Sequence, residues 1–235
     1  QIGWEIIGGN RNKIKEDKEI INTSLKCLKN LDFKNVELKI GDIELFNLFI
    51  SKLKIPQRFK TRLKRHFWRE KYFNTLLNRL SSNLKDDITK KVYNKKKYHQ
   101  LLKKNKNKII AGRSIDEISR RFLNKLNDPR GSLKIKHEVK LIKDFLKIKC
   151  PIKDAVKKLN FFFKQNNIDL KIYKNYFPIT NRKSSKLKIL FETSFGRELE
   201  YYTGMVFKIS IKNKDIISGG RYDNLIYDLG SKKKI

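Results

Sequence analysis

The spacing of hydrophobic residues predicts two strands and two helices at the front of the chain. Apolar and polar positions alternate over residues 1–9 and again over 35–42, which predicts a strand in each range. Between them, apolar residues recur at helical spacing and predict a helix over 15–30. Asp42 then stands where its side chain can cap a helix whose apolar face includes Leu45.

Helical spacing continues through the middle of the chain. It predicts one basic amphipathic helix over residues 56–80 and two further helices over 132–149 and 151–166. Ser114 and Glu117 have the spacing of a capping box, which predicts another helix start at this point. We therefore expect a long helical segment between the two ends.

After residue 185 the period changes from helical to alternating. Residues 186–196 predict a strand, and residues 203–223 predict a β-hairpin that turns within 212–215. Short strands on both sides of a helical segment indicate that the two ends share one sheet, which predicts an α+β fold. The predicted parts are a front core, a helical insertion and a back core, over residues 1–53, 54–185 and 186–235.

Composition limits the class of protein. Of the 235 residues, 39% are hydrophobic, so the chain can form a core despite its charge. It has no run of about 18 apolar residues, so no membrane span is expected. Cys27 and Cys150 are isolated from each other and from the three histidines, so we expect neither a metal site nor a disulfide framework. Such cysteine usage is typical of the reducing cytoplasm.

The formal net charge of +33 is typical of a protein that binds a polyanion. However, the chain is rich in Lys, Asn and Ile, as expected from an AT-rich genome, and its lysines are scattered over every segment. Solvated lysine faces are therefore favoured over a nucleic-acid surface. The arginines of the predicted 56–80 helix have two interpretations, an anion-binding edge or, the favoured one, a solvated face: Arg58, Arg62, Arg65 and Arg69.

Polar and aromatic groups concentrate near the end of the chain, in "FGRELEYYTGMVF" and "ISGGRYDNL". An arginine fork suits a carboxylate and an acidic side chain suits a cation, so these residues favour a small zwitterionic ligand. Strict strand alternation opposes this, because it places Arg197 and Tyr202 on opposite faces unless the chain bends at Gly196. The alternative is that the tyrosines pack on a sheet. Three glycines would allow a close backbone approach to a ligand: Gly204, Gly219 and Gly220.

These residues resemble a known family in three motifs. "RELEYYTGMVF" is similar to the histidine-binding signature of histidyl-tRNA synthetases and their non-synthetase paralogues, "GGRYDNL" to the glycine-rich strand that follows it, and "QIGWEIIGG" to the segment after motif 2. The resemblance implies a class II synthetase-like antiparallel sheet flanked by helices. It also implies a histidine site in which Gln1 and Glu5 hold the ammonium and imidazole side and Arg197 holds the carboxylate. Tyrosines would surround the ring: Tyr201, Tyr202 and Tyr222.

Departures from the synthetase pattern favour a paralogue. Glu198 and Glu200 stand where synthetases have glycine and aspartate, and 192 positions separate Glu5 from Arg197. The middle of the chain resembles the regulatory subunit of ATP phosphoribosyltransferase, in its longer proteobacterial form. That resemblance implies a non-catalytic protein without a cofactor, partnered with the short-form catalytic subunit of this glycosyltransferase. It would serve the first step of histidine biosynthesis, with histidine as the feedback inhibitor.

Two alternatives to the regulatory subunit remain. A histidyl-tRNA synthetase is the first, because the motif arginines that decide this activity would lie before Gln1 and after Ile235. A lysine-rich RNA-binding module is the second, although it explains none of the three motifs. Self-association through the synthetase-like core is also implied by the resemblance. We expect the chain to be an internal piece of a longer protein, since its only methionine is Met205.

Overall fold

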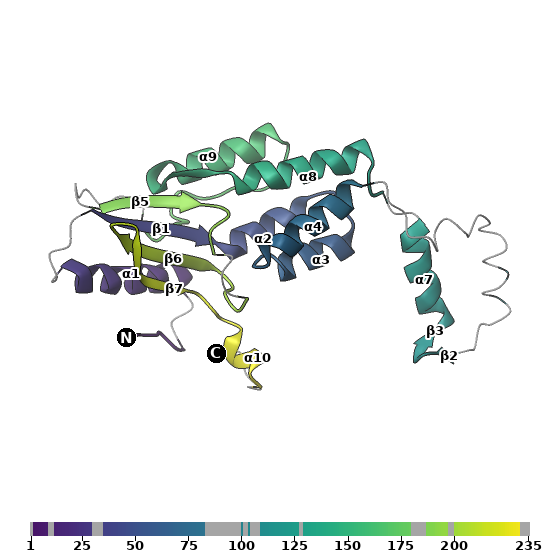
Figure 1. The fold of residues 1–235 in the computed structure, drawn as a ribbon, viewed down its shortest axis with the longest axis horizontal. Helices are drawn as coiled ribbons and strands as arrows, with labels where there is room; N and C mark the ends of the chain where they lie inside the picture. The colour runs from purple at the N-terminus through teal and green to yellow at the C-terminus, as the bar shows by residue number, and fades with distance from the viewer. Residues whose placement is uncertain are drawn as a thin grey trace.

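The chain forms an α+β fold around a five-stranded sheet (Figure 1). The computed structural model describes residues 2–8, 12–29, 35–82, 100, 103, 109–126, 129–179, 187–196 and 200–230. In spatial order the strands are β4 (Lys149–Pro151), β5 (Leu187–Glu192), β1 (Val36–Asp42), β6 (Met205–Ile211) and β7 (Lys214–Gly220). A separate hairpin is formed by β2 (Ile109–Ile110) and β3 (Arg113–Ser114).

The helices of the described residues form two groups around this sheet. Figure 1 shows α1 along one side of the sheet, and the group of α2, α3 and α4 beyond the C-terminal end of β1. The helices are α1 (Lys13–Lys29), α2 (Ile43–Lys52), α3 (Gln57–Arg65), α4 (Glu70–Ser81), α7 (Ile115–Leu126), α8 (Leu133–Leu146), α9 (Ile152–Gln165) and α10 (Leu225–Asp228). None of these combines the length and apolar character that crossing a bilayer requires.

The two ends of the chain share the sheet, as predicted. β1 lies at its centre, and Leu38 is paired with Ile209 of β6 in an antiparallel ladder. On its other side, Leu38 is paired with Ile189 of β5, and this ladder is parallel. The predicted synthetase-like α+β fold is confirmed, but the sheet is mixed rather than wholly antiparallel. The long connection through α2 to α9 makes this possible, because parallel neighbours need a crossover of a dozen or more residues.

Most predicted elements are present near their expected bounds. Asp42 caps α2, and its Oδ1 accepts a hydrogen bond from the Leu45 amide at 3.0 Å. Ser114 Oγ likewise accepts from the Glu117 amide at 3.2 Å, at the start of α7. The predicted hairpin is β6–β7, and its two turn residues, 212 and 213, have φ of 48° and 64°. Positive φ at both positions is the geometry of a type I′ turn, whose twist matches that of the strands.

The single helix predicted over 56–80 is instead two helices, α3 and α4, which are interrupted at residues 66–69. In a continuous helix, Phe67 and Phe73 would point about 120° apart. In the structure, Phe67 stacks on Phe46 with ring centroids 3.8 Å apart, and Phe73 lies 5.8 Å from Phe67. The interruption therefore lets both rings enter the same core.

The strand predicted over 1–9 is absent from the described residues 2–8, which are irregular. An alternating pattern becomes a strand only with a hydrogen-bonded neighbour. No described residue pairs with this segment, and the Ile2 side chain is 90% exposed.

Aromatic packing joins the helices to one another and to the sheet. Phe49 of α2 stacks on Phe145 of α8 with ring centroids 4.2 Å apart, and Phe163 of α9 lies 6.2 Å from both. The same hydrophobic core includes Phe191 of β5 and Phe207 of β6. It therefore contains residues of all three predicted parts, and the division into those parts stays a prediction.

Phe49→Ala should lower the free energy of unfolding by about 3–5 kcal/mol, because the ring is fully buried and its removal leaves a cavity. Phe161→Ala is the matched control, since the Phe161 side chain on α9 is 67% exposed. Its effect should stay within about 0.5 kcal/mol. Urea unfolding followed by circular dichroism measures both, and equal losses would contradict this description of the core.

Candidate functional site

Three tyrosines form one cluster beside the end of the sheet. The Tyr201 ring lies 4.8 Å from the Tyr202 ring and 6.2 Å from the Tyr222 ring, between centroids. Neighbouring residues of a strand would point to opposite faces, but residues 200–203 are not a strand. The turn before β6 therefore removes the conflict that strict alternation creates for the two neighbouring tyrosines.

Backbone hydrogen bonds beyond the β6–β7 hairpin hold the cluster together. The Thr203 amide donates to the Arg221 carbonyl at 2.7 Å, and the Arg221 amide donates to the Met205 carbonyl at 2.8 Å. Thr203 Oγ1 also accepts from the Asp223 amide at 3.1 Å. These bonds place the segment that carries Tyr202 beside the segment that carries Tyr222.

Glu5 reaches the cluster from the N-terminal segment. Burial raises the pKa of Tyr222, and a hydrogen bond to Glu5 and the charge of that carboxylate raise it further. A carboxylate beside tyrosine hydroxyls can hold a cationic group. Two other predicted ligands, Gln1 and Arg197, lie outside the described residues.

The three predicted glycines make room for neighbouring side chains. A Cβ atom at Gly220 would lie 2.8 Å from the Tyr202 ring, and one at Gly219 would lie 2.8 Å from the Phe207 ring. At Gly204 it would lie 3.0 Å from Cδ of Arg221. Gly220 therefore allows Tyr202 to lie against β7. Beside Tyr202 there is a small pocket, lined also by Phe195, Phe207 and Ser218 among others.

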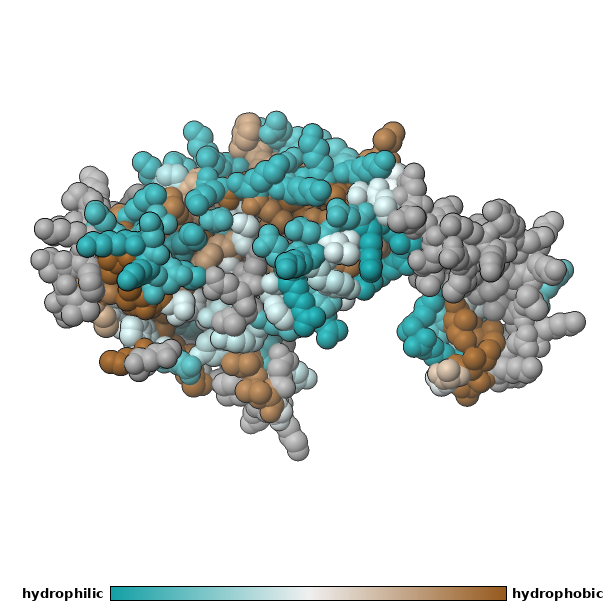
Figure 2. Space-filling view, viewed as in Figure 1, coloured by the Kyte–Doolittle hydropathy of each residue, from teal (hydrophilic) through white to brown (hydrophobic). Residues whose placement is uncertain are grey.

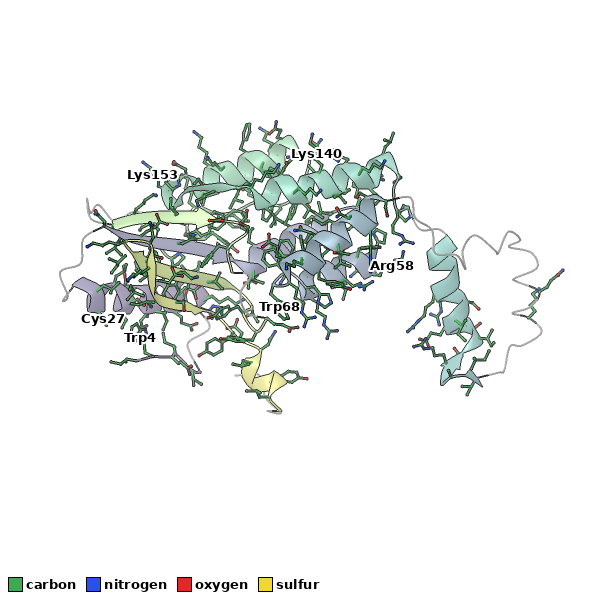
Figure 3. The ribbon with its side chains drawn as sticks, in the orientation of Figure 1. Trp4, Cys27, Arg58, Trp68, Lys140 and Lys153 are labelled. Atoms are coloured by element: carbon green, nitrogen blue, oxygen red, sulfur yellow. The ribbon has the colours of Figure 1, made fainter. Side chains whose placement is uncertain are left out.

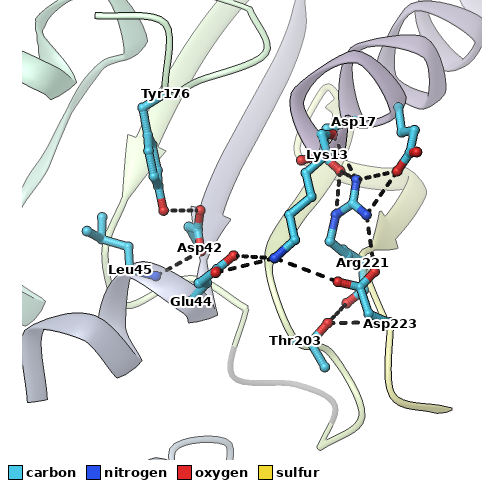
Figure 4. A network of polar contacts seen from close by, with 10 residues as sticks. Lys13, Asp17, Asp42, Glu44, Leu45, Tyr176, Thr203, Arg221 and Asp223 are labelled. Atoms are coloured by element: carbon cyan, nitrogen blue, oxygen red, sulfur yellow. Dashed lines mark hydrogen bonds and ion pairs between the residues drawn. The ribbon is translucent and has the colours of Figure 1, made fainter. Parts of the chain in front are cut away.

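Arg221 is held by carboxylates of the protein itself (Figure 4). Its Nη2 donates to Asp17 Oδ1 at 2.8 Å and to Glu16 Oε2 at 3.1 Å. Its Nη1 donates to Asp223 Oδ1 at 3.1 Å, and the Arg221 side chain is only 11% exposed. The idea that this arginine fork offers itself to a ligand carboxylate is therefore wrong. Its role is to attach α1 to the end of β7.

Two buried carboxyl groups lie near this ion-pair network and were not among the predicted site residues. Burial raises the pKa of Asp17 to about 6, although Arg221 opposes this. Burial also raises the pKa of Asp42 to about 6, although the Leu45 amide and the Tyr176 hydroxyl donate hydrogen bonds to it. The Tyr176 hydroxyl lies 2.8 Å from Asp42 Oδ2. Asp42 shows in the sequence as a helix cap, but no local pattern indicates its contact with Tyr176.

The site has the chemistry of an organic-ligand site. Tyrosine rings and hydroxyls, one carboxylate and small residues suit a polar ring that carries a positive charge. Within the described ranges, no three His, Cys, Asp or Glu side chains are placed to hold a metal ion.

Arg221→Ala should lower the free energy of unfolding by about 3–5 kcal/mol, because it leaves carboxylates buried without their cation. Arg121→Ala is the control, since Arg121 and its partner Glu117 have 59% and 42% exposed side chains. This exposed pair should contribute at most about 1 kcal/mol. Chemical unfolding at pH 7 measures both losses, and a small effect at Arg221 would disprove the attachment described above.

Stability should fall between about pH 4 and pH 7 because of Asp42. Its folded pKa of about 6 lies above the ordinary 3.8, so the contribution of its protonated form is complete below 3.8 and is lost as pH rises through 6. Compared with Asp42→Asn, which keeps an acceptor for the helix cap, the wild type should lose up to about 3 kcal/mol over this range. Tyr176→Phe removes a donor to the carboxylate and should move the loss to higher pH. A pH-independent difference between wild type and Asp42→Asn would contradict the raised pKa.

Comparisons with known proteins agree with the motifs. The family profile described as histidyl-tRNA synthetase matches residues 1–149 and 136–234. The chain is 27% identical to the ATP phosphoribosyltransferase regulatory subunit of Chelativorans sp. strain BNC1 and 25% identical to that of Brucella anthropi. Each alignment covers 100% of this chain and 68% of the relative.

Solved structures of the same kind are more distant. The ATP phosphoribosyl transferase (HisG:HisZ) complex from Thermotoga maritima matches with 14% identity and a TM-score of 0.42, over 91% of this chain and 58% of that chain. This chain therefore spans about two thirds of its curated relatives and little more than half of that solved chain. Because the family profile covers nearly all of its residues, the chain belongs to the histidyl-tRNA synthetase family.

Proposed function

We propose that the protein is a regulatory subunit of ATP phosphoribosyltransferase that binds histidine at the tyrosine cluster. The contact of Glu5 with Tyr222, beside Tyr201 and Tyr202, carries the proposal. The names of the similar bacterial proteins support the regulatory role. The protein would act in the cytoplasm, as the partner of the short-form catalytic subunit in the first step of histidine biosynthesis.

The residues of the cluster match the chemistry of histidine. This ligand has an ammonium group, a carboxylate and an imidazole ring that can both donate and accept hydrogen bonds. Glu5 would attract the ammonium or a protonated imidazole, and the tyrosine hydroxyls would meet the ring nitrogens. Arg197 would bind the carboxylate, as the family resemblance implies. Gln1 would assist Glu5.

Feedback inhibition requires histidine to bind two assembly states with different affinity. The cluster is suited to this role because its parts come from three separate segments, around Glu5, Tyr201 and Tyr222. A ligand held between them would fix their relative positions. The protein itself would have no catalytic residue, so its effect on the partner would be through the assembly, which includes self-association of the synthetase-like core.

A histidyl-tRNA synthetase is the second candidate, and the family match favours it. Both candidates bind histidine, so binding alone does not separate them. Histidine-dependent exchange between ATP and pyrophosphate does, when measured with the full-length protein. Exchange activity would identify a synthetase. No exchange, together with activation of the catalytic subunit and its inhibition by histidine, would support the regulatory subunit.

Glu5→Gln in the full-length protein should weaken histidine binding by about 1–3 kcal/mol, because the charged acceptor is lost. Glu19→Gln is the matched control, since Glu19 is exposed on α1 and outside the cluster, and it should leave the affinity unchanged. Isothermal titration calorimetry measures both. If Glu5→Gln binds histidine as tightly as the wild type, the ligand does not lie at this carboxylate.

A further inference from the structure

Arginine is concentrated in one short stretch of this lysine-rich chain. Of the 57 Lys and Arg residues only 13 are arginine, and four of these lie within residues 58–69. If lysine replaces arginine wherever charge alone is needed, arginines that remain together mark positions that need the planar fork. The guanidinium fork binds carboxylate or phosphate with two parallel hydrogen bonds, which lysine cannot do.

The structure gathers these arginines on one exposed surface of α3 and the turn that follows it. Helix α3 has five basic residues among nine and no acidic residue, and it is anchored by buried Phe59 and Leu63. All four arginines are exposed. Hydrophilic side chains cover the visible face of α3 and α4 (Figure 2). Figure 3 places Arg58 at one end of this surface and Trp68 at the other, nearer the sheet. We call it the arginine surface: Arg58, Arg62, Arg65 and Arg69 with Trp68 and Tyr72.

Aromatic rings orient two of the guanidinium groups. That of Arg69 lies over the Trp68 ring at 4.4 Å, and that of Arg62 lies over the Tyr72 ring at 6.0 Å and donates to its hydroxyl. His66 contacts the edge of the Tyr72 ring, with centroids 4.8 Å apart. Trp68 Nε1 and His66 Nδ1 are buried without a hydrogen-bond partner among the described residues. Such groups are rare in folded proteins, and here they lie in the turn that carries the arginines.

We propose that the arginine surface docks an acidic, carboxylate-bearing segment of the catalytic subunit. This inference rests on the proposed function, whose partner it uses. Complementary charge speeds association and fixes orientation, and Arg, Trp and Tyr are the residues that most often dominate binding at interfaces. A protein partner is favoured over single-stranded nucleic acid, because bases bind by stacking on open aromatic faces. Here each ring is partly buried and has a guanidinium over it.

The arginine surface adjoins the candidate histidine site. Burial lowers the pKa of His66, Arg65, Arg69 and Arg62 lower it further, and the charge of Glu200 opposes them. Glu200 directly precedes Tyr201, so the tyrosine segment lies near the turn that carries Arg69. The same segment is bound to the start of α2, whose Ile43 amide donates to the Gly204 carbonyl at 3.0 Å. Histidine that fixes the tyrosines would therefore act beside the docked partner.

The test uses the full-length protein and the purified catalytic subunit, with affinity measured by biolayer interferometry at several salt concentrations. Replacing Arg62, Arg65 and Arg69 together by alanine should raise Kd about 100-fold or more. The same three positions changed to lysine keep the charge and should still lose about tenfold, because the forks are missing. The control replaces the exposed Arg113, Arg120 and Arg121 by alanine, which removes equal charge and should change Kd less than about twofold. Thermal unfolding and histidine binding of each variant check its fold.

Three results would overturn the inference. If the alanine variant, or a lysine variant tested because the alanine variant fails to fold, binds the catalytic subunit like the wild type, the arginine surface is not the docking site. If the control loses as much affinity, only net charge matters. If a 20-nucleotide RNA binds the same arginines and displaces the catalytic subunit, the surface recognises nucleic acid. Failure of the wild type itself to bind the catalytic subunit would instead refute the proposed function, and the inference with it.

Discussion

The ion pairs of Arg221 connect the two ends of the chain. A guanidinium that is 11% exposed faces Asp17 and Glu16 on α1 and Asp223 on its own segment. Burial of such a group is favourable only when its donors are satisfied, and the Lys13 carbonyl accepts a further hydrogen bond from Nη2 at 2.8 Å. The position of α1 against the sheet and the path of the chain beyond β7 both depend on this arrangement. The tyrosine cluster lies between them, so its geometry depends on it as well.

Local pattern was sufficient where one element decides its own structure. The alternation of Leu38 and Ile40 gives β1, and Asp42 marks the start of α2, because these signals act over a few residues. The interruption between α3 and α4 could not be predicted in this way, since it follows from the stacking of Phe67 on Phe46, which lies in another helix. The irregular structure of residues 2–8 has a similar cause, because strand formation depends on a neighbour and not on the alternating sequence.

The candidate site was predictable only in part. Tyr201, Tyr202 and Tyr222 stood out through their motifs, and the structure brings their rings together. The role of Arg221 did not, because nothing near it in the sequence indicates that carboxylates on α1 surround its guanidinium. The basic helix shows the same limit. Sequence alone favoured a solvated face, whereas the aromatic groups beneath the arginines become visible only when the turn at residues 66–69 folds back.

The order of synthesis gives the Arg221 contact a temporal consequence. Asp17 and Arg221 are 204 residues apart. At translation rates of about 5–20 residues per second, Arg221 is made roughly 10–40 s after Asp17. Both strands that flank β1 are also made long after it, since β5 begins at Leu187. The N-terminal helix and the central strand therefore have to wait on the ribosome for their partners. The helices in between can pack first, so the helical middle is the part of this protein best placed to fold during translation.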